Sequence, residues 1–302
     1  MAIVSNDTVM WWMESLPGDP QTCVDRIRET MSEIPETSDW YRFGIRCADN
    51  LQMWISGKGE ISKSSLLLGG GNTKLGAQIV TFSAAPLSLD LCPGASELCL
   101  KKCYSKRSHR YPAPVFRQIT STVALKLEPG REQIRAAIAK LKTGATVRLY
   151  VDGDCTDVHD VFFWLEAARS RPDVNFYSYS KAFHLFLSVD NNGKLPGGWP
   201  DNWLVNASSH SRFAGTEVEA RFRALPVARA GFNMVSVKLP KHKAGVRRTR
   251  KALELIREAG REALRTDKVF ACPSACGNCL PKGEQACGSA RMNGVEIVEA
   301  IS

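Results

Sequence analysis

Seven of the ten cysteines in this 302-residue sequence fall into two groups. The first group has the pattern C-x6-C-x3-C, and the second has the pattern C-x3-C-x2-C-x7-C. Closely spaced thiols in a reducing compartment are typical of metal sites rather than disulfides, because one loop can bring several sulfur atoms to one centre. We therefore predict two metal-binding groups: Cys92, Cys99 and Cys103, and Cys272, Cys276, Cys279 and Cys287.

The spacing in the second group favours an iron–sulfur cluster over zinc. Structural zinc sites usually use two C-x2-C pairs, whereas here only Cys276 and Cys279 have that spacing. Four thiolates from an uneven loop that contains Pro and Gly suit a cluster, because its ligand positions are spread over a larger body. We expect a [4Fe-4S] centre, with zinc as the alternative metal.

The first group has three cysteines, which leaves one position of a cubane cluster without a protein ligand. Three arrangements are open: a three-iron cluster, a distant fourth ligand with Cys155 as the candidate, or an open iron that binds a small molecule. A further arrangement merges both groups into one cluster. The isolated Cys23 and Cys47 are expected to be small buried hydrophobic side chains.

Strands and helices alternate regularly after the N-terminal region. Segments rich in Val, Ile, Phe and Tyr predict strands at 78–83, 146–151, 174–179, 203–208 and 232–237. A weaker pattern predicts a further strand at 267–271. Helices are predicted at 112–127, 131–142, 157–169, 181–189, 216–224 and 244–265. This alternation predicts an α/β fold, a partial β/α barrel of parallel strands with helical crossovers, with an open sheet as the alternative.

The fold has three predicted parts. Residues 1–65 form an N-terminal helical extension that includes a helix at 20–34. Residues 66–265 form the β/α core with the first cysteine loop, and residues 266–302 form a C-terminal cysteine-rich metal-binding segment.

Polar residues follow successive predicted strands, where parallel β/α folds carry their chemistry. They are the first cysteine loop, Asp152–Cys155, Ser178–Lys181, Asn206–Ser211 and Lys238. We predict catalytic roles for Asp154 and Lys181, which would orient a small ligand. Tyr179 and Ser208 are predicted to contact the cofactor.

Lys and Arg number 40 against 31 Asp and Glu, a net charge of +9. Six basic residues and no acid follow Cys99, namely Lys101, Lys102, Lys106, Arg107, Arg110 and Arg117. Such a surface is expected to attract nucleic acid, or alternatively to offset the negative charge of thiolate clusters. The alternative function is therefore a non-catalytic, metal-stabilised protein that binds nucleic acid.

Several other classes are excluded. No run of about 18 apolar residues suggests a membrane helix, and residues 1–20 contain no Lys or Arg, unlike a secretory signal. We expect a cytoplasmic protein. Paired H-x3-H ligands and a G-x-S-x-G elbow are absent, and Gly69–Gly71 does not match a dinucleotide or phosphate-binding fingerprint.

Five blocks of the sequence resemble the gene product 88 family of phages and plasmids. The first is GNTKLGAQIVTFSAAPLSLDLCPGASELCLKKCYSKR, followed in order by VRLYVDGDC, FYSYSK, LVNASSHS and CPSACGNC. The resemblance covers about residues 66–290. It implies a mobile-element protein with two cysteine-rich regions, which would act in the host cytoplasm if phage-encoded.

A more distant likeness is to radical S-adenosylmethionine (SAM) enzymes, which hold a three-cysteine cluster after the first strand of a partial β/α barrel. This likeness implies an open iron that binds SAM. Those enzymes place a Gly-Gly-Glu-like segment after the second strand, where Gly153 and Asp154 fall here, so both residues are expected to contact the cofactor. Their cysteine loop is usually C-x3-C-x2-C, which differs from the spacing here.

Overall fold

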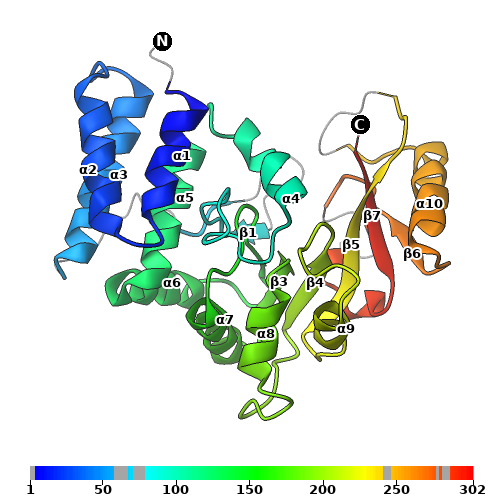
Figure 1. Cartoon of the computed structure of the whole chain (residues 1–302). Helices are drawn as coiled ribbons and strands as arrows, with labels where there is room; N and C mark the ends of the chain where they lie inside the picture. The colour runs from blue at the N-terminus through cyan, green and yellow to red at the C-terminus, as the bar shows by residue number, and fades with distance from the viewer. Residues whose placement is uncertain are drawn as a thin grey trace.

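The computed structural model describes residues 4–57, 67–70, 79–240, 246–276, 279–280 and 286–301. An all-helical N-terminal region precedes a β/α core (Figure 1). Gly71 and Gln78, which belong to two of the sequence predictions, lie outside the described residues.

The N-terminal region consists of three helices: α1 (Asn6–Ser15), α2 (Pro20–Ser32) and α3 (Asp39–Ile55). Each begins at a polar side chain that accepts hydrogen bonds from the first turn, as N-capping residues commonly do. The indole rings of Trp12 and Trp40 lie 5.3 and 5.8 Å from the ring of Phe116. These contacts pack α1 and α3 against the core, and α2 packs on both of these helices.

Seven parallel strands form one sheet in the order β1-β2-β3-β4-β5-β7-β6. The strands are β1 (Ile79–Thr81), β2 (Thr146–Leu149), β3 (Asn175–Ser180), β4 (Trp203–Ser208), β5 (Ala228–Ser236), β6 (Val269–Ala271) and β7 (Glu296–Ile301). The predicted α/β fold with parallel strands is confirmed, whereas curvature into a partial barrel stays a prediction. Strand β7, absent from the sequence prediction, lies between β5 and β6.

Helices connect the strands. They are α4 (Glu97–Lys101), the 3-10 helix η1 (Tyr104–Arg107), α5 (Pro112–Lys126), α6 (Glu128–Ala139), α7 (Val158–Ser170), α8 (Phe183–Asp190), α9 (Glu217–Arg223) and α10 (Arg250–Leu264). Two short 3-10 turns, η3 (Ala286–Gly288) and η4 (Ala290–Met292), precede β7. Helix α10 begins later than predicted because the Thr249 hydroxyl caps it by accepting from the amide of Ala252.

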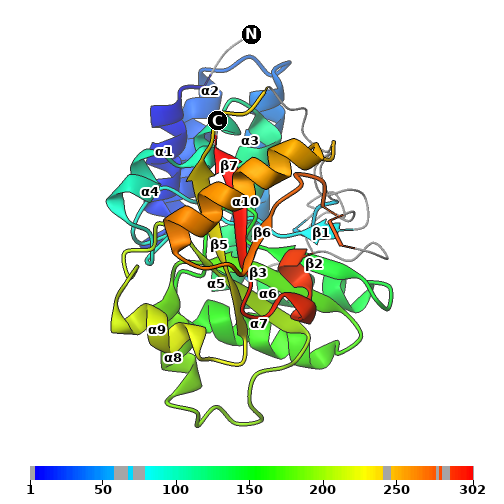
Figure 2. The same ribbon diagram turned by 90° about the vertical axis from the view of Figure 1, so that its right-hand side faces the viewer.

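The two faces of the sheet have different coverings. Val147, Phe176 and Val205 face the hydrophobic core beneath the helices. Their neighbours Arg148 and Tyr177 point to the opposite face, because successive side chains of a strand alternate. The same division holds at the far end of the sheet, where α10 lies across β6 and β7 (Figure 2). The second cysteine group lies on the face that the helices leave free.

Within the described ranges, the structure contains no helix with the length and hydrophobicity that a bilayer crossing requires.

Candidate metal and ligand sites

The loop that carries the first cysteine group is attached to the ends of β3 and β4. The hydroxyl of Ser211 donates to the carbonyl oxygens of Gly94 and Lys181 at 3.2 and 2.9 Å, and the amide of Ser96 donates to the carbonyl of His210. A Cβ atom at Gly94 would overlap the backbone of Lys181. Glycine in the C-P-G sequence therefore permits a close approach of two backbones.

The attached loop places its thiols beside Lys181. The ammonium group of Lys181 donates to the sulfur of Cys99 and to the hydroxyl of Ser208 at 2.9 Å. Burial raises the pKa of the Cys92 thiol, and the nearby Asp154 and Cys103 raise it further. Burial also raises the pKa of Cys99, whereas Lys181 opposes that shift. The three cysteines thus share one electrostatic environment with Asp154 and Lys181.

Both carboxylate oxygens of Asp154 accept internal hydrogen bonds. Oδ1 accepts from the Ser180 hydroxyl and from the Cys155 amide, both at 2.9 Å, and Oδ2 accepts from the Lys181 amide at 2.8 Å. Burial raises the pKa of Asp154, and these donors oppose that rise. Asp154 therefore holds the start of the Lys181 segment in place, and Lys181 presents its side chain to the thiols.

The other acid of the Asp-Gly-Asp sequence points elsewhere. Asp152 accepts from the hydroxyl of Ser105 at 2.6 Å, so the two carboxylates do not form a pair. Gly153 between them has φ +76°, and a Cβ there would lie 2.8 Å from the carbonyl oxygen of Ala84. Its glycine identity follows from the turn and from this close backbone contact.

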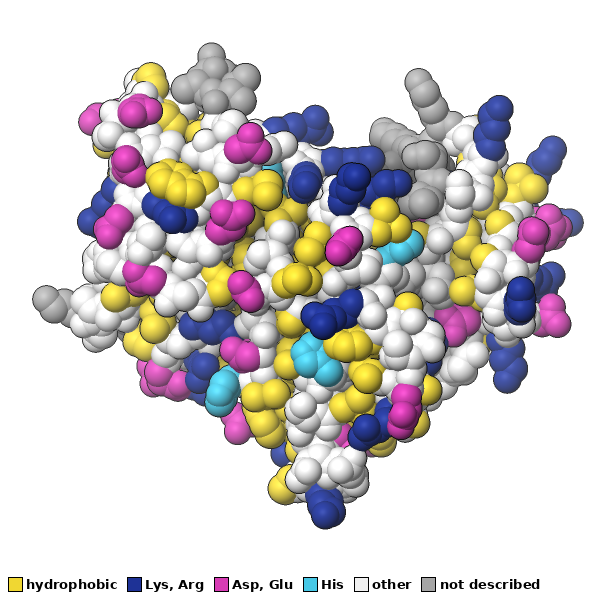
Figure 3. Space-filling view, in the orientation of Figure 1, with side chains coloured by type: hydrophobic (Ala, Val, Ile, Leu, Met, Phe, Trp, Pro, Cys, Tyr) yellow, Lys and Arg dark blue, Asp and Glu magenta, His cyan; other side chains and the backbone are white. Residues whose placement is uncertain are grey.

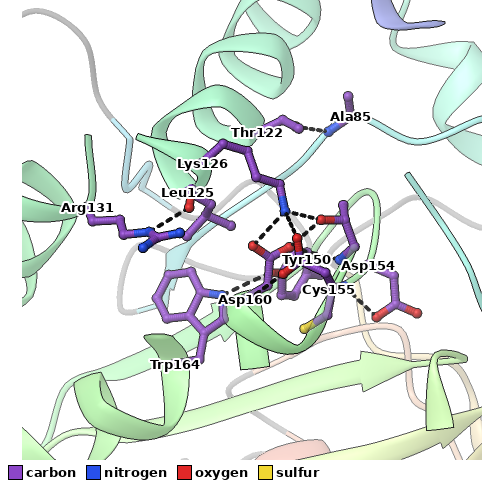
Figure 4. A network of polar contacts seen from close by, with 12 residues as sticks. Ala85, Thr122, Leu125, Lys126, Arg131, Tyr150, Asp154, Cys155, Asp160 and Trp164 are labelled. Atoms are coloured by element: carbon purple, nitrogen blue, oxygen red, sulfur yellow. Dashed lines mark hydrogen bonds and ion pairs between the residues drawn. The ribbon is translucent and has the colours of Figure 1, made fainter. Parts of the chain in front are cut away.

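Cys155 lies in the core rather than with the first group (Figure 4). Its thiol is hydrogen-bonded to the Tyr150 hydroxyl, and burial raises its pKa well above the ordinary value, with Asp154 and Asp160 adding to the shift. The Tyr150 hydroxyl also accepts from the indole of Trp164 at 3.0 Å. These contacts disfavour Cys155 as the fourth ligand.

The four cysteines of the second group line one small pocket against the free face of the sheet. Apolar and aromatic residues form its walls, among them Tyr177, Phe270 and Ile297. The backbone amide of Ala286 donates to the sulfur of Cys279 at 3.1 Å. The pocket thus combines soft sulfur donors with a largely apolar lining.

Tyr179 contacts this second group rather than Asp154. Its hydroxyl donates to the sulfur of Cys287, and burial raises the pKa of that thiol to about 12. Cys276 and Cys279 add to this rise, as expected for neighbouring thiols. Thiols of the second group therefore act on one another, which favours two separate sites over one merged cluster.

Arg148 of β2 was not among the predicted site residues, yet it lies between the two groups. Its guanidinium carbon is 4.9 Å from the centre of the Tyr179 ring, and its charge acts on both Tyr104 and Cys287. The sequence did contain a signal for this residue. Arg148 is a basic residue within the strand sequence Thr-Val-Arg-Leu, and it lies opposite the aromatic Tyr177 of the next strand. It places a positive charge beside Cys287 of the second group and beside Tyr104, which follows the last cysteine of the first group.

Among the described residues, no three His, Cys, Asp or Glu side chains are arranged around a single metal ion. The predicted Asp154, Lys181 and Ser208 come together with the first group, whereas Gly153 has a backbone role and Tyr179 belongs with the second.

Comparison with known families is consistent with this arrangement of motifs. The profile described as gene product 88 matches residues 54–294. The chain belongs to the gene product 88 family. The gene product 88 match contains both cysteine groups, whereas α1 and α2 precede it. The comparisons with curated proteins and with solved structures found no match.

Part of the gene product 88 region forms an exposed basic surface next to the first cysteine group. This α4–η1 patch consists of the exposed Leu98, Lys101, Lys102, Tyr104, Arg107, Arg110 and Tyr111 and the half-buried Lys106. Figure 3 shows Lys and Arg side chains gathered over α4. The rings of Tyr104 and Tyr111 are exposed, and the guanidinium of Arg110 lies 5.0 Å from the Tyr111 ring.

Proposed function

We propose that the protein is an iron–sulfur protein with a cluster at each cysteine group. The observation that carries this proposal is the set of four thiols, from residues 272–287, around one apolar pocket. Thiolates are the usual ligands of iron–sulfur clusters, and an apolar surrounding tunes cluster potential by limiting solvent access. Cys272, Cys276, Cys279 and Cys287 would hold a [4Fe-4S] cluster there, in a structural or electron-transfer role.

The donor set of the first group fits a cluster with one open position. Cys92, Cys99 and Cys103 would supply three thiolates. Lys181 donates to Cys99 and Ser208, so its ammonium stands where an anionic group of a small ligand would bind. A SAM carboxylate matches that charge, which makes a radical SAM-like enzyme our proposal for the activity.

Asp154 has a different role from the one that its position after a strand predicted. Its oxygens are occupied by Ser180, Lys181 and Cys155, so we assign it the positioning of Lys181 rather than direct contact with a ligand. A cluster at either cysteine group requires deprotonated thiols. The positive charge of Lys181 favours the thiolate form of Cys99, and that of Arg148 favours the thiolate form of Cys287.

Anaerobic purification followed by iron, zinc and acid-labile sulfide analysis tests the cluster proposal. We expect iron together with an equal amount of sulfide. Part of the iron and sulfide should be lost when the three cysteines of the first group are changed to Ala. The remaining part should be lost when the four cysteines of the second group are changed to Ala. The Cys23→Ala variant, altered at a buried position of helix α2, is the control and should retain all the metal. Zinc without sulfide would refute the cluster proposal.

The SAM proposal has its own readout. The paramagnetic spectrum of the reduced protein should change when SAM is added, and the change should disappear in Lys181→Met while the iron content is retained. A spectrum that SAM does not alter would refute SAM binding and leave the cluster proposal standing.

A second candidate function rests on the α4–η1 patch. Exposed tyrosines among basic side chains are typical of surfaces that bind single-stranded nucleic acid by stacking and charge. Retention on single-stranded DNA should fall steeply with salt and should drop in the Lys101→Ala/Lys102→Ala/Arg110→Ala variant. The matched control is Arg257→Ala/Arg261→Ala in α10. Retention that is independent of salt, or equal loss in the control, would contradict this function.

A further inference from the structure

A cavity of about 320 Å3 lies between α3 and α5, away from both cysteine groups. Its lining includes the apolar Phe43, Leu67 and Phe116, and the polar Asn50. Residues from α3 of the N-terminal region and from the core contribute jointly, so the cavity exists only where α3 packs on α5.

Two arginines give this cavity a positive charge. Arg46 and Arg117 both line it, and the described lining contains no acidic side chain. Neither arginine forms an ion pair with the described residues. The Nε atom of Arg117 is buried and has no hydrogen-bond partner there. A buried donor without an acceptor costs free energy, which a bound anion would recover.

The backbone around Arg117 holds its guanidinium in place. A Cβ atom at Gly69 would lie 2.7 Å from one of the guanidinium nitrogens. Gly69 is itself held by two backbone hydrogen bonds with Thr81, both 2.8 Å long. The guanidinium of Arg117 therefore lies against the backbone at Gly69 rather than against a carboxylate.

Helix α5 adds to the positive potential. It begins at Pro112 without a side-chain cap, and Ala113 and Pro114 of its first turn line the cavity. The N-terminal end of a helix carries a partial positive charge. Apolar walls on one side and guanidinium groups on the other match a molecule that has an apolar body and an anionic end.

We propose that this cavity binds a small amphipathic anion, with a carboxylate or phosphate group at Arg117 and Arg46 and an apolar body against Phe43 and Phe116. The site is independent of the iron–sulfur proposal. Four of its residues, Phe43, Arg46, Cys47 and Asn50, come from α3 ahead of the family match. The N-terminal helix α3 therefore supplies part of the binding site.

Displacement of the fluorescent anion 1-anilinonaphthalene-8-sulfonate from the full chain tests the proposal. We expect octanoate or octyl phosphate to displace it at concentrations at least tenfold lower than octanol does, and the stronger of the two identifies the preferred anionic group. Equal displacement by octanol would overturn the proposal, because the arginines would then contribute nothing.

Matched variants locate the site. Arg117→Gln should weaken the binding of octanoate or octyl phosphate about tenfold, as the loss of a charge-assisted hydrogen bond predicts. Arg42→Gln, altered at an exposed arginine of α3, should bind as the wild type does. Ala113→Phe, altered at an exposed position on the cavity wall, should block binding even if Arg117→Gln fails to fold. Unchanged binding in Ala113→Phe would place the ligand elsewhere and refute the proposal.

Discussion

The side-chain amide of Asn206 in β4 donates to the backbone carbonyl of Cys287 at 2.9 Å. The same amide donates to the carbonyl of Ser178, and its oxygen accepts from the guanidinium of Arg229 at 2.8 Å. Arg229 in turn donates to the carbonyl of Ser289 at 2.7 Å. A buried side chain in the centre of the sheet thus positions the last cysteine of the second group.

Asn206→Ala should therefore destabilise both the fold and the second site. The change removes these bonds and leaves Arg229 buried with an unpaired donor, so the free energy of unfolding should fall by about 3 kcal/mol. Iron at the second site should be lost, as measured by iron and sulfide content.

The matched control for this change is Asn202→Ala. The side chain of Asn202 also makes three hydrogen bonds, all as a donor, to the carbonyls of Ala168, Arg171 and Val174, and none of them involves a cysteine. It should lower stability while retaining iron. If both variants lost iron equally, general instability would explain the result and the positioning role of Asn206 would be excluded.

Gly94→Ala should displace the first cysteine loop. Its new Cβ would overlap the carbonyl group of Lys181, so the loop must move. The free energy of unfolding should fall by about 2 kcal/mol. We expect the iron of the first site to be lost and that of the second to remain. Gly18→Ala, where nothing lies within 4 Å of the added atom, should leave iron content and melting temperature unchanged. Full iron content in Gly94→Ala would show that the loop tolerates the shift.

Cys155→Ala should retain the iron of the first site, whereas Cys99→Ala should lose it. Cys155 is buried beside Tyr150, so its removal leaves a small cavity and costs about 1 kcal/mol of stability. Iron analysis and thermal unfolding of the two variants provide the comparison. Equal iron loss in both would assign Cys155 as a ligand.

Lys126→Met should make stability depend more strongly on pH. The Lys126 ammonium lies 3.1 Å from Asp160, whose carboxylate is buried (Figure 4). Burial raises the pKa of Asp160, and Lys126 opposes this rise. Without Lys126, the folded-state pKa should rise further above the unfolded value of about 3.9. Protonation of Asp160 then stabilises the folded state. This stability is fully present below the pKa of Asp160 in the unfolded chain, and it is lost as the pH increases through its pKa in the folded protein.

Denaturant unfolding across the pH range checks this expectation. The variant should lose about 3 kcal/mol near neutral pH, as expected when a buried ion pair is broken, and less in acid. Lys126→Met/Asp160→Asn removes the buried charge as well, so it should recover part of the stability and lose the added pH dependence. An equal loss for Lys126→Met at all pH values would exclude ionisation of Asp160 as the cause.

The strands and helices of the core were largely predictable, because alternating strand and helix segments recur at regular intervals along the chain. Predicted strand 203–208 agrees with β4 at both ends. Strand β7 was missed because it follows a cysteine loop rather than a helix, and it enters the sheet between β5 and β6. Local sequence carries little information about the order of strands in a sheet.

The sequence by itself determined which thiols are grouped, which residues follow the strands, and that the sheet is parallel, because these depend on residue type and local periodicity. The tertiary structure decided their neighbours. Tyr179 points to Cys287 because alternate side chains of β3 leave opposite faces, and Cys155 is buried beside Tyr150. The cavity at Arg117 exists because α3 packs on α5. Such contacts join residues far apart in sequence, so only the folded chain brings them together.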